Sequence, residues 1–474
     1  MGSRDLREYI EKHENNGDLK RVTREVDWNL ELSHVAKLNE EKKGPALLFE
    51  NVKGYDIPVL TGVWGTTERW ATELGLPRDC SMMTLAMEWG EILGREKIPP
   101  KVVKDGPIME NVIEEKDVDI LDFPVPYFYP KDGGRYIGTA YALVSKDPET
   151  GWVNLGTYRL QAHDRNHTGI QMNPSKHARM HLEKYQKKGE KMPVAAVIGG
   201  PPIIFPLGGG DIPPGVSEYD VGGAILGEAI QVIESDLTGL PIPATAEIVL
   251  EGEMNPDPSS FILEGPFGEA TGYYSGKPTE KEVIHVKRIL HRNNPIFNAT
   301  TVGRPTTDTH MVGVISRGGA FWRQLQDTKI PGIKAFAIPP EMGNRGIIIS
   351  VKQLYPGHSK QVLTAAASTP YGAFACKVFI VVDDDIDPED YGRVAWAVSQ
   401  RFDAQRSITI LTGRRSTWLE PGIEPKKRYP FPMISTILID GCTPYEWEEK
   451  PEIIELDQKM VEKIKKEWHE YGLG

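Results

Sequence analysis

A change of pattern near residue 118 constrains the fold of this chain more than any other sequence feature. From that point short strand-like runs dominate, and Gly and Pro residues separate them. One helical pattern, over residues 221–234, interrupts the series. A block of this kind is typical of an antiparallel sheet or barrel of moderate size. Its runs span residues 139–144, 153–160, 194–198, 245–250 and 282–290.

The segments on either side follow other patterns. Residues 1–110 mix helix and strand signals, whereas runs of the two kinds alternate regularly toward the C-terminus. That alternation predicts βαβ units and a parallel sheet. The N-terminal helices are predicted at 5–13, 66–76 and 82–94, with strands at 45–52 and 57–63. The C-terminal strands are predicted at 346–351, 378–382 and 408–411, with helices at 317–327, 357–368, 388–402 and 457–471.

Length and composition exclude several classes of protein. A chain of 474 residues exceeds one ordinary core, so two or three domains are expected. The net charge of −12 argues against a nucleic-acid partner, because a groove that follows phosphates needs an excess of Lys and Arg. We expect no signal peptide and no membrane span, since the apolar runs are short or broken by Gly and Pro. Three widely spaced cysteines indicate a reducing cytoplasm.

Two carboxylates bracket a stiff turn at residues 264–269, Glu-Gly-Pro-Phe-Gly-Glu. Glycine allows unusual backbone angles there, and proline restricts the approach of the chain. Glu264 and Glu269 could therefore be aimed at a common point, where one delivers a proton and the other tunes its pKa. The alternative is a surface turn with two solvated acids.

An arginine lies in the predicted strand at 153–160. In that strand Asn154, Gly156 and Tyr158 would face one way, and Arg159 and Gln161 the other. An arginine in a half-buried strand needs a partner, and a substrate carboxylate, a Glu or a phosphate would bind its planar fork. A structural ion pair is the alternative.

His177 and His181 are four residues apart on a helix predicted over 174–188. This spacing can ligate zinc from one helical face, but a zinc protease needs Glu after the first His, where this chain has Ala178. One His as a metal ligand and the other at the surface is the interpretation that remains.

Two further runs have weaker implications. The aspartate-rich segment 383–387 does not fit a calcium loop, and we expect Asp387 to cap a helix whose first turn holds Pro388. The three glycines at 208–210 could form a nest of amides for an anion, although a glycine run is weak evidence alone.

Taken together and in order, these segments resemble the UbiD family of prenylated-flavin-dependent decarboxylases. The resemblance covers nearly the whole chain and depends on residues 154–159, 213–218, 264–269 and 381–387. It implies an α/β and α+β multidomain fold: a central split β-barrel flavin-binding domain, an N-terminal α/β domain and a C-terminal α/β oligomerisation domain. The expected boundaries are 1–115, 116–305, a helical linker at 306–330, and 331–474.

The resemblance also implies cofactors. Family members bind prenylated FMN with a divalent metal, usually Mn²⁺ (or Mg²⁺), and often K⁺. Asn154, His177 and Glu218 would be the metal ligands, a donor set that suits a hard divalent ion. In some members small hydroxyl residues stand where this chain has glycines 208–210. The residues expected at the cofactor are Asn154, Thr157, Tyr158, Arg159, Lys176, His177 and Glu218, with Lys377 as a further contact.

A catalytic set of Arg159, Glu264 and Glu269 follows from the same resemblance. Arg159 would position the substrate carboxylate or pair with Glu264, and Glu269 would donate a proton. Loss of CO₂ from an sp² carbon leaves an electron pair that no side chain can accept, and in the family the modified flavin does so through a covalent adduct with the substrate. The expected reaction is reversible, non-oxidative decarboxylation of an aromatic or α,β-unsaturated acid.

The expected partners are that acid and CO₂, a flavin prenyltransferase that supplies the cofactor, and further copies of the chain in a homodimer or homohexamer. One alternative is a UbiD-like catalytic subunit of a multisubunit arene or phenol carboxylase. Another is a non-catalytic paralogue, against which the intact Arg159, Glu264 and Glu269 argue. Metal-dependent hydrolysis leaves the flavin-type segments unexplained.

Overall fold

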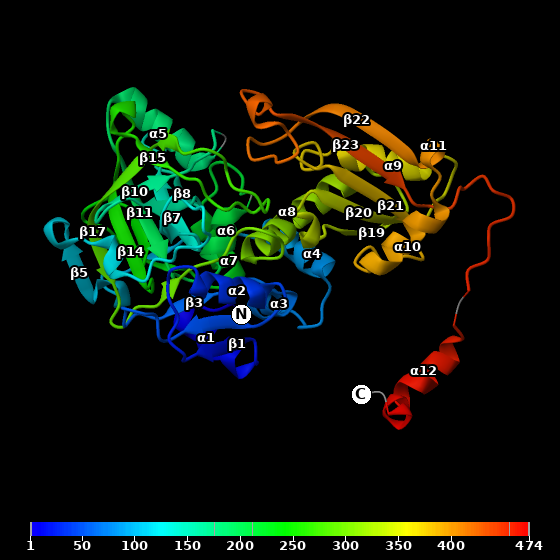
Figure 1. The fold of residues 1–474 in the computed structure, drawn as a ribbon, viewed down its shortest axis with the longest axis horizontal. Coiled ribbons are helices and arrows are strands. Elements are labelled where there is room, and N and C mark those ends of the chain that lie inside the picture. The colour runs from blue at the N-terminus through cyan, green and yellow to red at the C-terminus, as the bar shows by residue number, and fades with distance from the viewer. Residues whose placement is uncertain (1, 175, 211, 455, 473–474) are drawn as a thin grey trace.

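The computed structural model describes residues 2–174, 176–210, 212–454 and 456–472. Figure 1 shows an N-terminal α/β unit beside a large curled sheet, then the long helix α8 (Asp308–Asp327), then a second sheet beyond that helix. The multidomain α/β and α+β class with a curled, half-barrel centre is therefore confirmed.

The N-terminal unit contains a four-stranded sheet in the order β1-β2-β3-β18. Its last strand comes from the far end of the central segment and pairs parallel with β3. Helix α1 begins where the side chain of Asp5 accepts the Glu8 N–H at 2.8 Å. The strands are β1 (Leu19–Val22), β2 (Ala46–Phe49), β3 (Val59–Thr61) and β18 (Phe297–Asn298), and the helices are α1 (Leu6–Asn15), α2 (Glu31–Glu40), α3 (Thr67–Leu74) and α4 (Met82–Ile92).

The central sheet has nine strands, all paired antiparallel, in the order β6-β9-β10-β17-β14-β11-β7-β8, with β5 beside β17. Consecutive strands β8 and β9 therefore lie near opposite ends of this order, although three residues separate them. Such a short connection requires the sheet to curl. The strands are β5 (Asn111–Glu114), β6 (Tyr136–Gly138), β7 (Tyr141–Lys146), β8 (Val153–Gly156), β9 (Leu160–Ala162), β10 (His167–Ile170), β11 (Met192–Ile198), β14 (Ile248–Met254) and β17 (Val283–His291).

Short helices and strands surround the central sheet. Helices α5 and α6 contact both β7 and β8, and α7 contacts β8 and α6. A small sheet is formed by β4, β12 and β13, and β15 pairs with β16. Their bounds are α5 (His177–Lys188), α6 (Ile204–Gly209), α7 (Glu218–Leu226), β4 (Lys101–Val102), β12 (Gln231–Glu234), β13 (Pro241–Pro243), β15 (Ile262–Glu264) and β16 (Thr279–Lys281).

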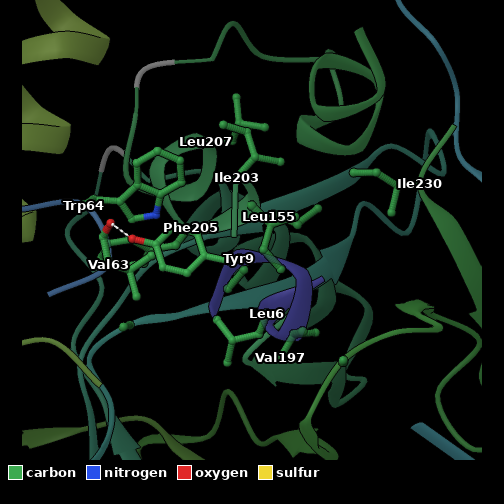
Figure 2. Close-up of a cluster of buried hydrophobic side chains, with 14 of the residues drawn as sticks. Leu6, Tyr9, Val63, Trp64, Leu155, Val197, Ile203, Phe205, Leu207 and Ile230 are labelled. Atoms are coloured by element: carbon green, nitrogen blue, oxygen red, sulfur yellow. Dashed lines mark hydrogen bonds between the residues drawn. The ribbon is translucent and has the colours of Figure 1, made fainter. Parts of the chain in front are cut away.

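A buried apolar cluster joins helix α1 to the central sheet (Figure 2). Leu6 and Tyr9 of α1 lie in one core with Leu155 of β8. The Tyr9 hydroxyl also donates to the carbonyl of Val63 at 2.6 Å. Because Leu155 faces this core, its neighbour Asn154 faces the other side of the strand.

Two predictions for the central part of the chain are wrong. The predicted strand at 153–160 is broken, because Thr157 leaves the ladder and donates its N–H to the Gly208 carbonyl at 3.1 Å. The predicted helix at 221–234 ends at Leu226, where Gly227 adopts a left-handed φ of 73°, and the following residues form β12.

The C-terminal sheet has the order β19-β20-β21-β23-β22. Its three central strands are parallel, which confirms the prediction for the strands at 346–351 and 378–382. The prediction is wrong for the strand at 408–411, which forms the antiparallel edge strand β22, and the third parallel strand is β23. The other edge strand, β19, also runs antiparallel to its neighbour. Helix α12 (Gln458–Lys466) lies away from the rest of the chain in Figure 1. The other elements are β19 (Ile333–Ala337), β20 (Gly346–Val351), α9 (His358–Ser368), β21 (Val378–Asp383), α10 (Tyr391–Arg401), α11 (Ala404–Ser407), β22 (Ile408–Arg415) and β23 (Met433–Asp440).

One helix cap in this region differs from the prediction. Asp390, not Asp387, caps α10 and accepts the Arg393 N–H at 2.9 Å. Asp387 instead accepts the Glu389 N–H at 2.9 Å, which closes a turn before the helix. In the part of the chain that the structure describes, no helix is long and apolar enough to cross a membrane.

Trp70 is the central residue of a tryptophan cluster in the N-terminal unit. It is 0% exposed, its ring lies 4.5 Å from Trp64 and 5.6 Å from Trp89, and its Nε1–H donates to the Trp64 carbonyl. Trp70→Ala should lower the free energy of unfolding by about 3–5 kcal/mol through the cavity it leaves. Denaturant unfolding measures this, with the half-exposed Trp396→Ala as control. Equal effects of the two substitutions would contradict the role of Trp70.

Candidate active site

The three predicted metal ligands come from three elements and meet beside β8. Asn154 lies on β8, His177 is the first residue of α5, and Glu218 is the first residue of α7. Oδ1 of Asn154 is 2.9 Å from Nδ1 of His177. Glu218 accepts the Leu155 N–H at 2.7 Å, which holds its carboxylate against the same strand.

These side chains line a cavity of 310 Å³. Tyr158 and Lys176, both predicted as cofactor contacts, line it as well. The cavity thus collects most of the residues that were expected around a cofactor and a metal. The remaining described residues of its wall are Leu155, Gly156, Gly208, Gly210, Ile212 and Pro213.

The electrostatics of this cavity fit a cation. Burial raises the pKa of Glu218 to about 8, against the partial compensation of the Leu155 N–H. Oγ of Ser217, beside Glu218, is buried without a hydrogen-bond partner among the described residues. An amide oxygen, an imidazole and a carboxylate suit a divalent ion. Within the described ranges no group of three or more His, Cys, Asp or Glu side chains could hold a metal ion.

Aromatic contacts orient the imidazole of His177. The ring of Trp152 lies 4.8 Å from that of His177 and 5.0 Å from that of His181, edge to face with both. His181 is fully buried, its Nδ1 is 3.0 Å from Oγ of Ser145, and burial lowers its pKa to about 4. The expectation that His181 lies at the surface is therefore wrong, and it acts as packing beneath His177.

Arg159 binds both predicted carboxylates. Its Nε and Nη2 donate to the two oxygens of Glu264 at 2.7 and 2.6 Å, a bidentate pair, and its Nη1 donates to Oε1 of Glu269. The guanidinium also lies 5.3 Å from the centre of the Phe267 ring. The three predicted catalytic side chains are thus brought into direct contact.

The loop of residues 264–269 is anchored from several sides. Tyr136 donates its hydroxyl to Oε1 of Glu264 at 3.2 Å, and the Gly265 N–H donates to Oε1 of Gln161 at 2.7 Å. Gly265 has φ of 88°, a left-handed conformation that a side chain would strain. Glu264 is 1% exposed, so the alternative of two solvated acids on a surface turn is wrong.

Glu269 has the environment of a proton donor. Its side chain is 14% exposed. Burial raises the pKa of Glu269, the charge of Arg159 opposes that rise, and the charge of Glu264 adds to it. The net direction is upward, so the Glu269 carboxyl holds a proton more readily than an ordinary glutamate does.

Three predicted cofactor residues lie outside the cavity wall. One is Arg159, which lies in the cluster with Glu264 and Glu269. Thr157 lies beside the cavity wall, with its Oγ1 donating to the Tyr141 carbonyl at 3.1 Å. Lys377 lies just before β21 in the C-terminal sheet, where its ammonium binds Glu420 at 2.9 Å. The structure therefore does not bring Lys377 together with the other predicted site residues in this conformation.

Two residues of the site were not predicted, because they belong to no sequence motif. Tyr136 bonds Glu264, and Asp132 accepts the Gly268 N–H at 2.9 Å. Both contacts join segments far apart in the sequence. The local signal was an Asp-Gly-Gly turn at 132–134, which predicts a turn but no partner.

Three profiles of one family match the chain. The 3-octaprenyl-4-hydroxybenzoate carboxy-lyase N-terminal domain matches residues 10–89, the Rift-related domain matches 101–305, and the C-terminal domain matches 310–441. The chain therefore belongs to the UbiD family of carboxy-lyases.

Individual relatives cover nearly the whole chain. A phenolic acid decarboxylase of Sedimentibacter hydroxybenzoicus is 34% identical over 94% of this chain and 93% of that protein. The open form of vanillic acid decarboxylase from the same organism (ShVdcCD, with truncated ShVdcD) is 31% identical, with a TM-score of 0.87 over 99% and 100% of the two chains. An evolved dimeric form of the UbiD-class enzyme HmfF from Pelotomaculum thermopropionicum, in complex with prFMN, is 27% identical, with a TM-score of 0.81 over 96% and 98%.

Proposed function

We propose that this protein catalyses reversible, non-oxidative decarboxylation of an aromatic or α,β-unsaturated carboxylic acid with prenylated FMN. The observation that carries the proposal is the contact of Arg159 with Glu264 and Glu269, where burial raises the pKa of the second carboxyl. Relatives described as phenolic and vanillic acid decarboxylases support an aromatic acid, and the prFMN complex of HmfF supports the cofactor.

The cofactor would be held at the cavity beside β8. Asn154, His177 and Glu218 would hold Mn²⁺ or Mg²⁺, and the divalent ion would supply positive charge for the cofactor phosphate. The cofactor would be contacted by Thr157, Tyr158, Arg159 and Lys176, and K⁺ would bind in addition. Lys377 would reach the cofactor only if the C-terminal unit approached the cavity. When bound, prenylated FMN supplies the electron sink for the pair that remains when CO₂ leaves.

The chain's own residues would perform the positioning and the proton transfer. Arg159 orients the substrate carboxylate through its guanidinium, while Glu264 holds that guanidinium in a fixed plane. Glu269 then delivers its proton to the carbon that has lost CO₂. In the carboxylation direction Glu269 takes that proton back.

Assembly is part of the proposal. We propose four segments, 1–115, 116–305, a linker at 306–330, and 331–474, with the last joining copies into a homodimer or homohexamer. A flavin prenyltransferase would supply the cofactor in the cytoplasm, where the three unpaired cysteines would stay reduced.

The second candidate function is that of a catalytic subunit in a multisubunit arene or phenol carboxylase. It is favoured by the related vanillic acid decarboxylase structure, which is described with a second component, ShVdcD. Co-purifying subunits, and no turnover without them, would favour it.

Replacing the proton donor tests the reaction. The protein is co-expressed with a flavin prenyltransferase, purified without oxygen and screened with aromatic acids for CO₂ release. Glu269→Gln should lower turnover by about 10²–10⁴-fold and leave the bound flavin spectrum unchanged. Glu280→Gln, an exposed glutamate on β16, is the control. Full turnover in Glu269→Gln excludes its role, and the absence of flavin in the wild-type protein contradicts the proposed function.

Replacing His177 tests the metal site. His177→Ala removes the imidazole ligand, so the Mn²⁺ content and the flavin content of the purified protein should fall together, each by about tenfold or more. Elemental analysis and absorbance measure the two. His469→Ala, on an exposed C-terminal residue, should retain both. Full metal occupancy in His177→Ala would rule out His177 as a ligand.

The pH profile tests the coupling between the two glutamates. The negative charge of Glu264 raises the pKa of Glu269, so Glu264→Gln should lower that pKa. Because a donor must be protonated, decarboxylation falls as pH rises through the pKa of Glu269. The alkaline limb of the rate profile should therefore move to lower pH in Glu264→Gln. An alkaline limb that stays in place in an active variant would refute the assignment.

A further inference from the structure

A second segment, residues 129–133, lies against the loop that carries Glu269. Oδ1 of Asp132 accepts the Gly268 N–H at 2.9 Å, and Oδ2 accepts the Tyr129 N–H at 3.0 Å. The Gly133 N–H donates to the Pro266 carbonyl at 2.7 Å. The loop is thus tied to this segment on both sides of its central residue.

The two segments are closer than side chains would allow. A Cβ at Gly268 would lie 2.5 Å from Cδ2 of Tyr129, and a Cβ at Gly133 would collide with the Gly265 carbonyl oxygen. Glycine at these positions is therefore required for the contact rather than for a turn alone. The loop backbone has no room to move toward residues 129–133.

Asp132 is the polar centre of this contact. It is 6% exposed, and both of its oxygens accept backbone N–H groups, one from its own turn and one from the loop. The charges of Arg159 and Glu269 act on the pKa of Asp132 in opposite directions: Arg159 lowers it and Glu269 raises it. Burial raises its pKa to about 6, so it accepts both hydrogen bonds as a carboxylate near neutral pH.

We propose that Asp132 is a positioning residue for the proton donor. It holds the peptide between Phe267 and Gly268, which directly precedes Glu269, and thereby keeps the Glu269 carboxyl in contact with Arg159. This inference rests on the proposed function. The alternative is a local role, in which Asp132 only closes the turn of residues 129–132 through the Tyr129 N–H.

Asp132→Asn separates the two roles in the cofactor-loaded enzyme. Asparagine has the size of aspartate but one acceptor oxygen, so one of the two N–H groups loses its partner. We expect kcat to fall by about 10- to 100-fold, because displacement of a catalytic group by about 1 Å costs that much, while KM and flavin content stay within about twofold. Asp403→Asn is the matched control, since Asp403 accepts the N–H groups of Gln405 and Arg406 at 3.1 and 3.2 Å in the C-terminal unit.

Hydrogen exchange at the Gly268 amide is the second readout and needs no activity. The amide should be protected in the wild-type protein and should exchange at least about tenfold faster in Asp132→Ala, which removes both acceptor oxygens. An unchanged kcat in Asp132→Ala, or an unprotected Gly268 amide in the wild-type protein, would overturn the inference. A loaded wild-type protein that turns over no acid would instead overturn the proposed function, and the exchange experiment would still decide whether Asp132 anchors the loop.

Discussion

One arginine between two carboxylates is the constraint on which the rest of the site depends. When all three groups are ionised, Arg159, Glu264 and Glu269 carry a net charge of −1 in a poorly solvated place. Binding one proton removes that excess at low cost. Glu264 has both oxygens on the arginine fork, whereas Glu269 has one oxygen on it. This difference supports the proposal that Glu269 is the proton donor.

Such a cluster requires a scaffold that fixes each partner, because a buried charge that loses its partner costs about 3–5 kcal/mol. The chain meets this requirement with separate supports. Tyr136 of β6 holds Glu264, and Gln161 of β9 holds the Gly265 N–H. The proposed metal end is supported in the same manner, since Trp152 packs against His177 and the β8 backbone holds Glu218. Side chains at both ends of the site are thus held by contacts within the chain itself.

The sequence could predict those parts of the fold and the site that depend on interactions between residues close together in the chain. The strand β20 (Gly346–Val351) was predicted to the residue because a local apolar run sets its limits. The predicted strand at 153–160 failed because residues that favour strands continue through Thr157 and Tyr158. The N–H of Thr157 donates to the Gly208 carbonyl, a partner that no local pattern indicates. The helix predicted at 221–234 failed because Val232 and Ile233 continue its apolar spacing beyond the Gly227 cap. The motif residues of the site were found, but Tyr136 and Asp132 were not, since their contacts exist only in the folded chain.

The break in that strand is also what creates the site. Strands β8 and β9 lie near opposite ends of the central sheet, yet only residues 157–159 connect them. Four peptide steps span at most about 14 Å, so the sheet must curl until these regions nearly meet. The connecting residues then lie in the opening of the half-barrel. Asn154 precedes them on β8, and Arg159 is the last of them. A continuous strand would have kept these two side chains on opposite faces, about 17 Å apart. The turn therefore sets how close the proposed metal end and the proton-donating end can be, and both ends follow from one short stretch of backbone.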